Sequence, residues 1–381
     1  MNLFLLIFFL AYGAMHIYAY RRMTGCMPLT VTARNFWRIT IVLASLSPSM
    51  VRLLEVHGHD RLALAVAWPG YIWMGFIFIF TVALVIMDLF RLAFKRANRN
   101  RYRNTPEILN RRLSFEVILL LSIVATAYGL YEARNIHTEQ LTIRTAKVKV
   151  PVRVVQLSDV HLGLLTRENR LSAMLDVVRQ ARPDILVSTG DLLDGRLSRQ
   201  EDGEGFLRVE AMLRGIEAPQ GKFAVMGNHE YYAGEEHAVE VTTAAGFSML
   251  RNGYAALPNG ILIAGVDDVA WKRMKRPAQA VSELELLNSL PKDMFRIYLK
   301  HKPVVKPESI GLFDLQLSGH THRGQILPFY LLTKFQFPLP GGTVKLPDGS
   351  YLHTSRGSGT WGPPIRLFAP PEITIIDIVP E

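Results

Sequence analysis

The first 135 residues contain four apolar segments that are each long enough to cross a lipid bilayer, and this pattern constrains the fold more than any other feature. A membrane-spanning helix needs about 20 predominantly apolar residues. Arg21 and Arg22 follow the first apolar run, whereas a secretory signal carries its positive charge ahead of the run, so we expect a retained helix. The sequence therefore predicts an all-α transmembrane region of about four helices over residues 1–135, with spans near residues 3–20, 36–54, 66–94 and 114–131.

The basic residues of the chain are concentrated between these segments. Residues 1–150 carry 18 Lys and Arg against 7 Asp and Glu, whereas residues 151–381 carry 25 against 26, which gives +11 and −1. Short loops rich in Lys and Arg remain on the cytoplasmic side of a membrane. The loop after the third segment is the richest, with Arg91, Lys95, Arg96, Arg99, Arg101, Arg103, Arg111 and Arg112.

This charge distribution predicts an integral protein of the cell membrane, inner or plasma, with every residue after Tyr131 on the extracytoplasmic side. Because membrane topology explains the excess positive charge, we expect membrane lipids as partners and no binding to nucleic acid. No obligate protein partner is indicated. The single cysteine, Cys26, excludes an intrachain disulfide and disfavours a metal site built from cysteines.

The pattern changes near Val150, where short apolar strands begin to alternate with amphipathic helices. Residues 169–181, for example, place Leu171, Met174 and Val178 on one helical face. Strands with crossover helices, followed by strands with few helices, are typical of α/β layers. We expect a linker over residues 136–150 and an α/β domain over residues 151–381, with strands near 152–157, 185–188, 223–226, 262–266, 295–299, 315–318, 351–354 and 373–378.

Five short blocks in this domain supply side chains that bind metals, and each lies at or just after the end of a predicted strand. Ligands of open α/β sheets bind at the carboxyl ends of strands. Asp-x-His or Gly-Asp alone is common by chance, but five blocks in one domain are not. The blocks are Asp159-Val160-His161, Gly190-Asp191, Gly227-Asn228-His229-Glu230, Lys300-His301 and Gly319-His320-Thr321-His322.

The chemistry of these side chains indicates metal-assisted hydrolysis of a phosphate ester. Carboxylate, amide and imidazole ligands together suit divalent Mn, Fe or Zn. A bridging carboxylate holds two ions roughly 3.5–4 Å apart, which clamp phosphate oxygens and generate a hydroxide nucleophile near neutral pH. A further histidine must protonate the departing alkoxide. The blocks therefore predict a centre of two divalent metal ions.

The glycines and the His-x-His spacing have expected physical roles. Gly190, Gly227 and Gly319 can adopt a positive φ or let backbone approach a ligand closely. If the segment from His320 to His322 is extended, both imidazoles point to one side and reach adjacent metals. We expect His353 to be structural, His237 to lie on the solvated surface and Asp267-Asp268 to form a turn.

These blocks resemble the signature of the calcineurin-like metallophosphoesterase superfamily, D-x-H, G-D, G-N-H-[DE], H and G-H-x-H. The segments around residues 317–326 and 355–366 resemble its membrane-associated branch, which includes YkuE, YaeI and the transmembrane protein with metallophosphoesterase domain. The resemblance covers residues 151–379 and implies a four-layer α/β/β/α sandwich. It implies one metal held by Asp159, His161, Asp191 and His322, and a second held by Asp191, Asn228, His301 and His320.

The resemblance also implies roles for the remaining residues. His229 would act as the general acid, oriented by the carboxylate of Asp159, while a metal-bridging hydroxide attacks phosphorus. Arg323 departs from the branch, which usually has glycine there, and either contacts a phosphate or faces solvent. Arg356 and Arg366 are further candidates for phosphate contacts.

The resulting hypothesis is a membrane-anchored dimetal phosphohydrolase of the phosphodiesterase or pyrophosphatase type. Its four spans favour a lipid-linked or membrane-proximal phosphoester as substrate. The alternative is a transporter or sensor with a regulatory metal-binding C-terminal domain. Few polar residues interrupt the spans, Arg38 and Asp88 among them, and transporters usually carry polar residues near the midplane. The sequence names neither the substrate nor the metal.

Overall fold

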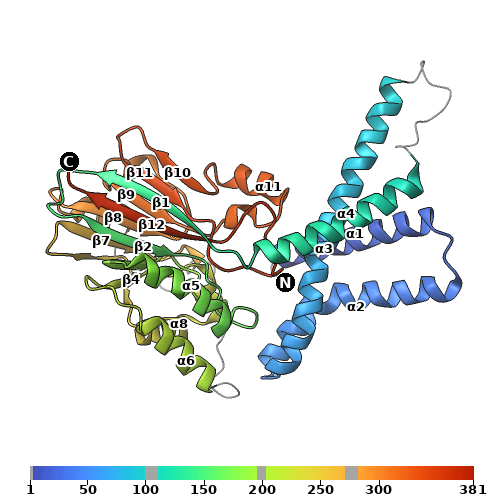
Figure 1. The fold of residues 1–381 in the computed structure, drawn as a ribbon, viewed down its shortest axis with the longest axis horizontal. Helices are drawn as coiled ribbons and strands as arrows, with labels where there is room; N and C mark the ends of the chain where they lie inside the picture. The colour runs from blue at the N-terminus through green and yellow to red at the C-terminus, as the bar shows by residue number, and fades with distance from the viewer. Residues whose placement is uncertain (1–2, 99–109, 195–202, 271–281) are drawn as a thin grey trace. The chain divides into compact units, whose positions relative to one another are not determined.

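The computed structural model describes residues 3–98, 110–194, 203–270 and 282–381. These residues form two compact units, one helical and one with mixed sheets (Figure 1). The helical unit comprises Met1–Tyr131 and Gly362–Leu367, and the second unit comprises Glu132–Trp361 and Phe368–Glu381. The short segment Gly362–Leu367 thus groups with the helices although it lies far downstream in the sequence.

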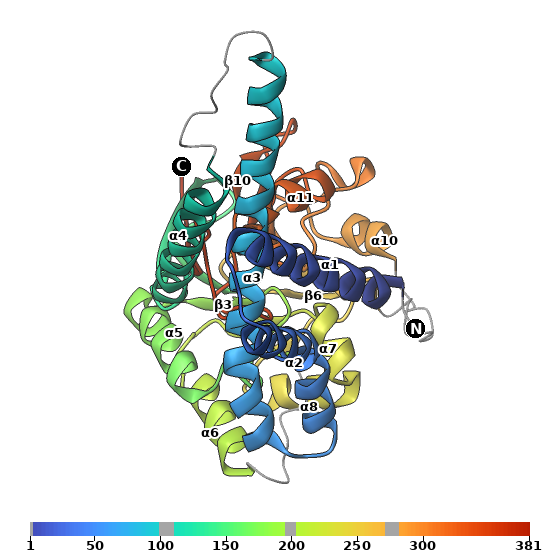
Figure 2. The ribbon, with the colours of Figure 1, turned by 90° about the vertical axis from the view of Figure 1, so that its right-hand side faces the viewer.

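The helical unit contains four long helices, and three of those in the described residues are long and apolar enough to cross a membrane. Those three are α2 (Val31–Val56), α3 (Asp60–Ala97) and α4 (Arg111–Glu132). The first helix, α1 (Leu3–Cys26), packs with α2 against α3 (Figure 2). Its expected span stays a prediction, and Arg99, Arg101 and Arg103 lie outside the described residues.

Buried aromatic and aliphatic side chains hold the helical unit together. Tyr12 of α1, Phe80 of α3 and Phe115 of α4 belong to one buried cluster. The in-span carboxylate of Asp88 accepts hydrogen bonds from Tyr18 at 2.6 Å and Arg22 at 2.8 Å. The charge of Asp88 is therefore paired within the helical unit.

The second unit contains two six-stranded mixed sheets, which confirms the predicted class of α/β fold. The first sheet has the order β1-β12-β2-β3-β4-β5 and the second β10-β11-β9-β8-β7-β6. The strands of the first are β1 (His137–Arg144), β12 (Glu372–Val379), β2 (Val152–Leu157), β3 (Ile185–Ser188), β4 (Lys222–Ala224) and β5 (Ser248–Met249). Those of the second are β10 (Gly342–Lys345), β11 (Tyr351–Thr354), β9 (Leu315–Ser318), β8 (Phe295–Lys300), β7 (Ile261–Val266) and β6 (Gly253–Ala256).

Alternating side chains of these strands build a four-layer sandwich of the α/β/β/α type. In β2, Val154 faces the second sheet, whereas Val155 joins the core beneath the first layer of helices. Leu262 and Ala264 of β7 pack outward against the other helical layer. The helices are α5 (Glu168–Ala181), α6 (Gly203–Arg214), α7 (Asn228–Ala233), α8 (Glu235–Ala244), α10 (Glu283–Ser289) and α11 (Phe329–Gln336), with the 3-10 turns η2 (Pro307–Ser309) and η3 (His322–Gly324).

Strand β1 lies within residues 136–150, which we expected to form a linker. It pairs in parallel with β12 along its whole length and forms the edge of the first sheet. Its side chains are mostly polar and exposed, and Ile143 is the one fully buried. Such an edge strand produces no apolar run in the sequence, which is why the pattern did not reveal it.

Candidate metal centre

The five ligand blocks meet because their strands run parallel and end at the same edge of the two sheets. β2, β3 and β4 are parallel neighbours in the first sheet, and β8 and β9 in the second. The two sheets stack face to face, so their carboxyl ends bring the blocks together. The residues brought together are Asp159, His161, Asp191, Asn228, His229, His301, His320 and His322.

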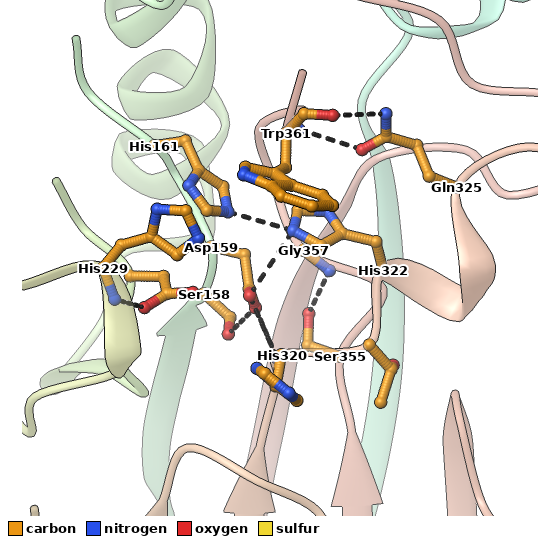
Figure 3. A network of polar contacts seen from close by, with 12 residues as sticks. Ser158, Asp159, His161, His229, His320, His322, Gln325, Ser355, Gly357 and Trp361 are labelled. Atoms are coloured by element: carbon orange, nitrogen blue, oxygen red, sulfur yellow. Dashed lines mark hydrogen bonds and ion pairs between the residues drawn. The ribbon is translucent and has the colours of Figure 1, made fainter. Parts of the chain in front are cut away.

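The side chains brought together by the strand ends form two clusters, each able to hold a metal ion, and a third group of His161, Asp194 and His229 also lies close enough to do so. In the first, potential ligand atoms of Asp159, His161 and His322 lie within 4.8 Å of one another. His161 Nε2 and His322 Nε2 are 3.0 Å apart and face each other in Figure 3. The cluster is fully buried, so a bound cation would be shielded from bulk water.

The second cluster consists of Asp191, His301 and His320. His301 Nε2 lies 3.1 Å from Asp191 Oδ2 and 3.1 Å from His320 Nδ1. Asn228 precedes His229, whose backbone N–H donates to Asp191, and Asn228 Oδ1 is buried without a hydrogen-bond partner in the described residues. Buried polar atoms normally have partners. An orphaned amide oxygen, a carboxylate and converging imidazoles fit a divalent cation.

Five of these residues adopt a left-handed backbone conformation, which is uncommon for any residue except glycine. The φ angles are 50° at Asp159, 53° at His161, 52° at Asp191, 71° at His320 and 46° at His322. Each such conformation costs on the order of 1–3 kcal/mol and clusters at functional sites. The packed sheets must therefore hold these residues in place.

This conformation corrects the expected geometry of the His-x-His segment. His320 and His322 have positive φ and Thr321 has helical angles, so the segment is a tight turn and not extended. The turn sends His320 toward His301, and His322 toward His161. The two histidines thus serve different clusters because of the turn, not because of strand alternation.

Close packing at two glycines shows why no larger residue fits there. A Cβ at Gly319 would overlap Ser158 Oγ and Asp159 Oδ2, and a Cβ at Gly227 would overlap Asp191 Oδ1. Neither glycine has a positive φ, so close approach is the reason for both.

A buried chain of hydrogen bonds orients the carboxylate of Asp159. Gln156 donates to Thr189 Oγ1 at 2.9 Å, Thr189 donates to Ser158 Oγ at 2.7 Å, and Ser158 donates to Asp159 Oδ2. The backbone N–H of His320 also donates to Asp159, at 2.9 Å. Such partners hold a ligand in position before a metal binds.

Hydrogen bonding also fixes the tautomer of His301. Its Nδ1 lies 2.9 Å from the carbonyl oxygen of Thr189, which only accepts, so Nδ1 carries the proton and Nε2 faces Asp191. Burial lowers the pKa of His301, but the charge of Asp191 outweighs it and raises the pKa to about 10. A metal ion that binds His301 through Nε2 would have to displace the proton on that atom. Burial and the charge of His301 lower the pKa of His320 well below its ordinary value, which keeps it neutral.

The carboxylate that orients His229 is Asp194, not Asp159 as the resemblance implied. Asp194 Oδ1 lies 2.7 Å from His229 Nδ1 and 3.4 Å from His161 Nδ1. Burial lowers the pKa of His229, but the charge of Asp191 and the hydrogen bond of Asp194 outweigh this and raise it to about 9. His229 is therefore protonated at neutral pH. Sequence reasoning missed Asp194, which follows Asp191 by three residues in the same loop.

Glu230, noted in the sequence only as the last residue of its block, links two of the ligand loops. Its carboxylate accepts from the backbone N–H of Asp191 at 2.9 Å, Leu193 at 3.1 Å and Gly227 at 2.8 Å. Burial and the charge of Asp191 raise its pKa to about 7. Because it joins the loops after β3 and β4, it fixes the spacing of their ligands.

Two exposed aromatic rings flank His229 at the mouth of the site. The Tyr232 ring lies 5.4 Å from the imidazole and the Trp361 ring 6.0 Å, both edge-on. The side-chain amide of Gln325 holds the Trp361 backbone by two hydrogen bonds of 2.9 Å, drawn in Figure 3. Nothing in the sequence pattern marked these rings.

The arginines considered for phosphate contacts differ in their surroundings. Arg356 pairs with Glu372 at 3.0 Å and Glu139 at 2.6 Å, so its charge is already neutralised. Arg366 is fully buried and groups with the helical unit. Arg323 is exposed, and its guanidinium lies 5.9 Å from the centre of the Tyr330 ring.

The other residues considered in the sequence have structural contacts. His353 is buried beside Glu372 and Thr343, as expected of a structural histidine. Asp267 accepts from Tyr231 at 3.1 Å, and Lys302 donates to Asp268 at 2.9 Å. Half-buried His237 differs from the expected surface histidine.

Comparison with known proteins agrees with this geometry. Residues 152–324 match the model of the calcineurin-like phosphoesterase family. A metallophosphoesterase of Aquifex aeolicus is 38% identical over 264 residues, which cover 68% of this chain and 98% of the relative. The metallophosphoesterase YkuE of Bacillus subtilis is 31% identical over 65% of this chain and 87% of its own length.

One relative also matches the helical unit. The transmembrane protein with metallophosphoesterase domain of Danio rerio is 26% identical over 380 residues, which cover 93% of this chain and 83% of the relative. The high identity to a relative that this chain covers almost completely confirms the resemblance inferred from the five blocks. The chain belongs to the calcineurin-like metallophosphoesterase family, whose members are metal-dependent phosphoric ester hydrolases.

Proposed function

We propose that this protein is a membrane-anchored phosphohydrolase that uses two divalent ions to cleave a phosphodiester or pyrophosphate. The convergence of two ligand clusters at one sheet edge carries the proposal. Asp159, His161, Asp191 and His322 would hold one ion, and Asp191, Asn228, His301 and His320 the other, with Asp191 shared. When bound, such ions neutralise phosphate oxygens and lower the pKa of a coordinated water toward neutrality.

The protein's own residues prepare the departure of the leaving group. His229 is held by Asp194 and carries a proton at neutral pH, so it can donate that proton to the leaving oxygen. The backbone N–H of His229 donates to Asp191 at 2.8 Å, which ties the acid to the shared ligand. Tyr232 and Trp361 restrict the directions from which a leaving group can reach the imidazole.

The experiment is hydrolysis of bis-p-nitrophenyl phosphate by the full chain in detergent, supplied with Mn, Fe or Zn. We expect metal-dependent turnover that Asp191→Asn abolishes together with the bound metal. His229→Ala should keep the metal and reduce strongly the hydrolysis of a diester with an alkyl leaving group, which needs a proton, more than that of the nitrophenyl diester. A wild-type chain that binds no metal and hydrolyses neither this diester nor a pyrophosphate would contradict the proposal.

We further propose a substrate in or near the membrane and a catalytic domain on the extracytoplasmic side. The three apolar helices support membrane anchoring, and the basic residues Lys95, Arg96, Arg111 and Arg112 flank the connection between α3 and α4. A C-terminal alkaline phosphatase fusion, which is active only outside the cytoplasm, should be active in cells. An inactive phosphatase fusion with an active cytoplasmic reporter would reverse the assigned orientation.

A further inference from the structure

Helix α11 exposes large apolar side chains on one face. Leu331 and Leu332 are each 64% exposed, and Phe335 is 94% exposed. These residues lie at helical spacing i, i+1 and i+4, so they form a continuous stripe, while Thr333 on the opposite side is buried. We refer to Leu331, Leu332 and Phe335 as the α11 face. A soluble protein surface seldom presents side chains of this size side by side unless something covers them.

Both ends of α11 are attached to the metal centre. The helix follows η3, which begins at the ligand candidate His322, with four residues between the two elements. Immediately after the helix, the ring of Phe337 packs edge-on against His320 at 5.3 Å. The two ends of α11 are therefore joined to residues that belong to the metal centre.

A bilayer crossed by the chain's own apolar helices could cover the α11 face. The apolar helix α4 ends at Glu132 and β1 begins at His137, so four residues join them. A connection of that length spans at most roughly 17 Å. When α4 crosses a bilayer, this short connection keeps the start of β1 within that distance of the end of α4.

The residues flanking the face match the surface of a bilayer. Lys334 within the helix and Arg323 just before it are both exposed, so they can reach lipid phosphates while the apolar side chains enter the acyl boundary. Leucine and phenylalanine on one side with basic residues at the edge are typical of helices that lie in a membrane interface.

We propose that α11 inserts Leu331, Leu332 and Phe335 into the interface of the bilayer that the chain's own helices span. This insertion presents the mouth of the metal centre to lipid headgroup phosphates. The insertion of α11 does not depend on the proposed function. The expected effect of the insertion on a lipid substrate rests on the proposed function. Two measurements therefore test the two parts separately.

The first measurement locates position 335 relative to lipid. The full chain carrying Cys26→Ser and Phe335→Cys is labelled with an environment-sensitive nitrobenzoxadiazole dye and placed in nanodiscs that contain nitroxide lipids. The matched control is Tyr254→Cys on β6, 47% exposed, in the same background. We expect blue-shifted emission and at least fivefold stronger quenching at position 335 than at position 254.

Two results overturn the insertion. Equal quenching at both positions means that the α11 face remains in water. In the second result, the dye at position 335 shows blue-shifted emission but no quenching by nitroxide lipids, and its emission returns to the wavelength seen in water when each disc holds one chain. This result means that a second copy of the chain covers the α11 face.

The second measurement compares two substrates with the same leaving group, soluble bis-p-nitrophenyl phosphate and hexadecyl p-nitrophenyl phosphate embedded in the disc. The variant Leu331→Asp/Phe335→Asp changes exposed residues outside the ligand set. We expect its rate on the soluble diester to stay within about twofold and its rate on the lipid diester to fall at least tenfold. Equal rates on the lipid diester for variant and wild type contradict a role of α11 at the lipid surface. Quenching at position 335 in a chain that hydrolyses neither diester nor a pyrophosphate refutes the proposed function and leaves the insertion intact.

Discussion

Replacing Asp194 by asparagine should weaken catalysis in proportion to how much the leaving group needs a proton. Asp194 Oδ1 lies 2.7 Å from His229 Nδ1, and a hydrogen bond between charged partners contributes about 1.5–3 kcal/mol. Because the Asp194 side chain is 38% exposed, solvent screening favours the lower end, which corresponds to about tenfold in rate. Asparagine keeps the shape and removes the charge that raises the pKa of His229.

The assay compares a diester with an alkyl leaving group and bis-p-nitrophenyl phosphate, whose nitrophenolate departs without protonation. We expect the alkyl rate to fall about tenfold and the nitrophenyl rate to fall less than threefold. Activity needs protonated His229 and is lost as pH rises through its pKa, so the alkaline limb should move to lower pH in the variant.

The control variant is Asp176→Asn on α5, which removes an exposed carboxylate paired with Arg179 at 2.7 Å and should change neither rate. Metal content measured on the same samples separates loss of the acid from loss of the ions, because Asp194 also lies 3.4 Å from His161. Equal losses for both leaving groups, at unchanged metal content, would refute the assignment of Asp194 to the acid.

Three further predictions follow from the contacts around the site. Glu230→Ala should lower the free energy of unfolding by about 3–5 kcal/mol, because it leaves three buried N–H donors unpaired. Chemical denaturation measures this free energy, and the exposed Glu236→Ala serves as the control. A loss below about 1 kcal/mol for Glu230→Ala would contradict the prediction. Gly319→Ala should bind at least tenfold less metal, because its Cβ would overlap Ser158 and Asp159. The bound metal is measured by plasma mass spectrometry. The control Gly253→Ala has open space around its Cβ and should bind metal normally. Chelation of the metal should lower the melting temperature of the wild type, because an ion at 100 times its Kd stabilises by about 2.7 kcal/mol, and it should leave Asp191→Asn unchanged.

Local sequence determines much of this protein because its main signals are local. The long apolar runs gave the helices α2, α3 and α4, although the span expected at the N-terminus stays a prediction. Short apolar runs located β2, β3 and β9 at their observed bounds, while the polar edge strand β1 left no such signal. The resemblance of five blocks to one family signature identified the family.

The tertiary structure decided how the blocks act on one another. Asp194 reaches His229 only because the loop after β3 folds back over α7, a contact between residues 35 apart that no local pattern encodes. The turn at His320 and His322 exists because the packed sheets hold five left-handed residues that an isolated peptide would avoid. The exposure of the α11 face is likewise evident only in the folded structure, because the same apolar residues would be predicted from the sequence to lie in the core. Ligand types are thus a property of the sequence, whereas the orientation and protonation of those ligands depend on long-range packing.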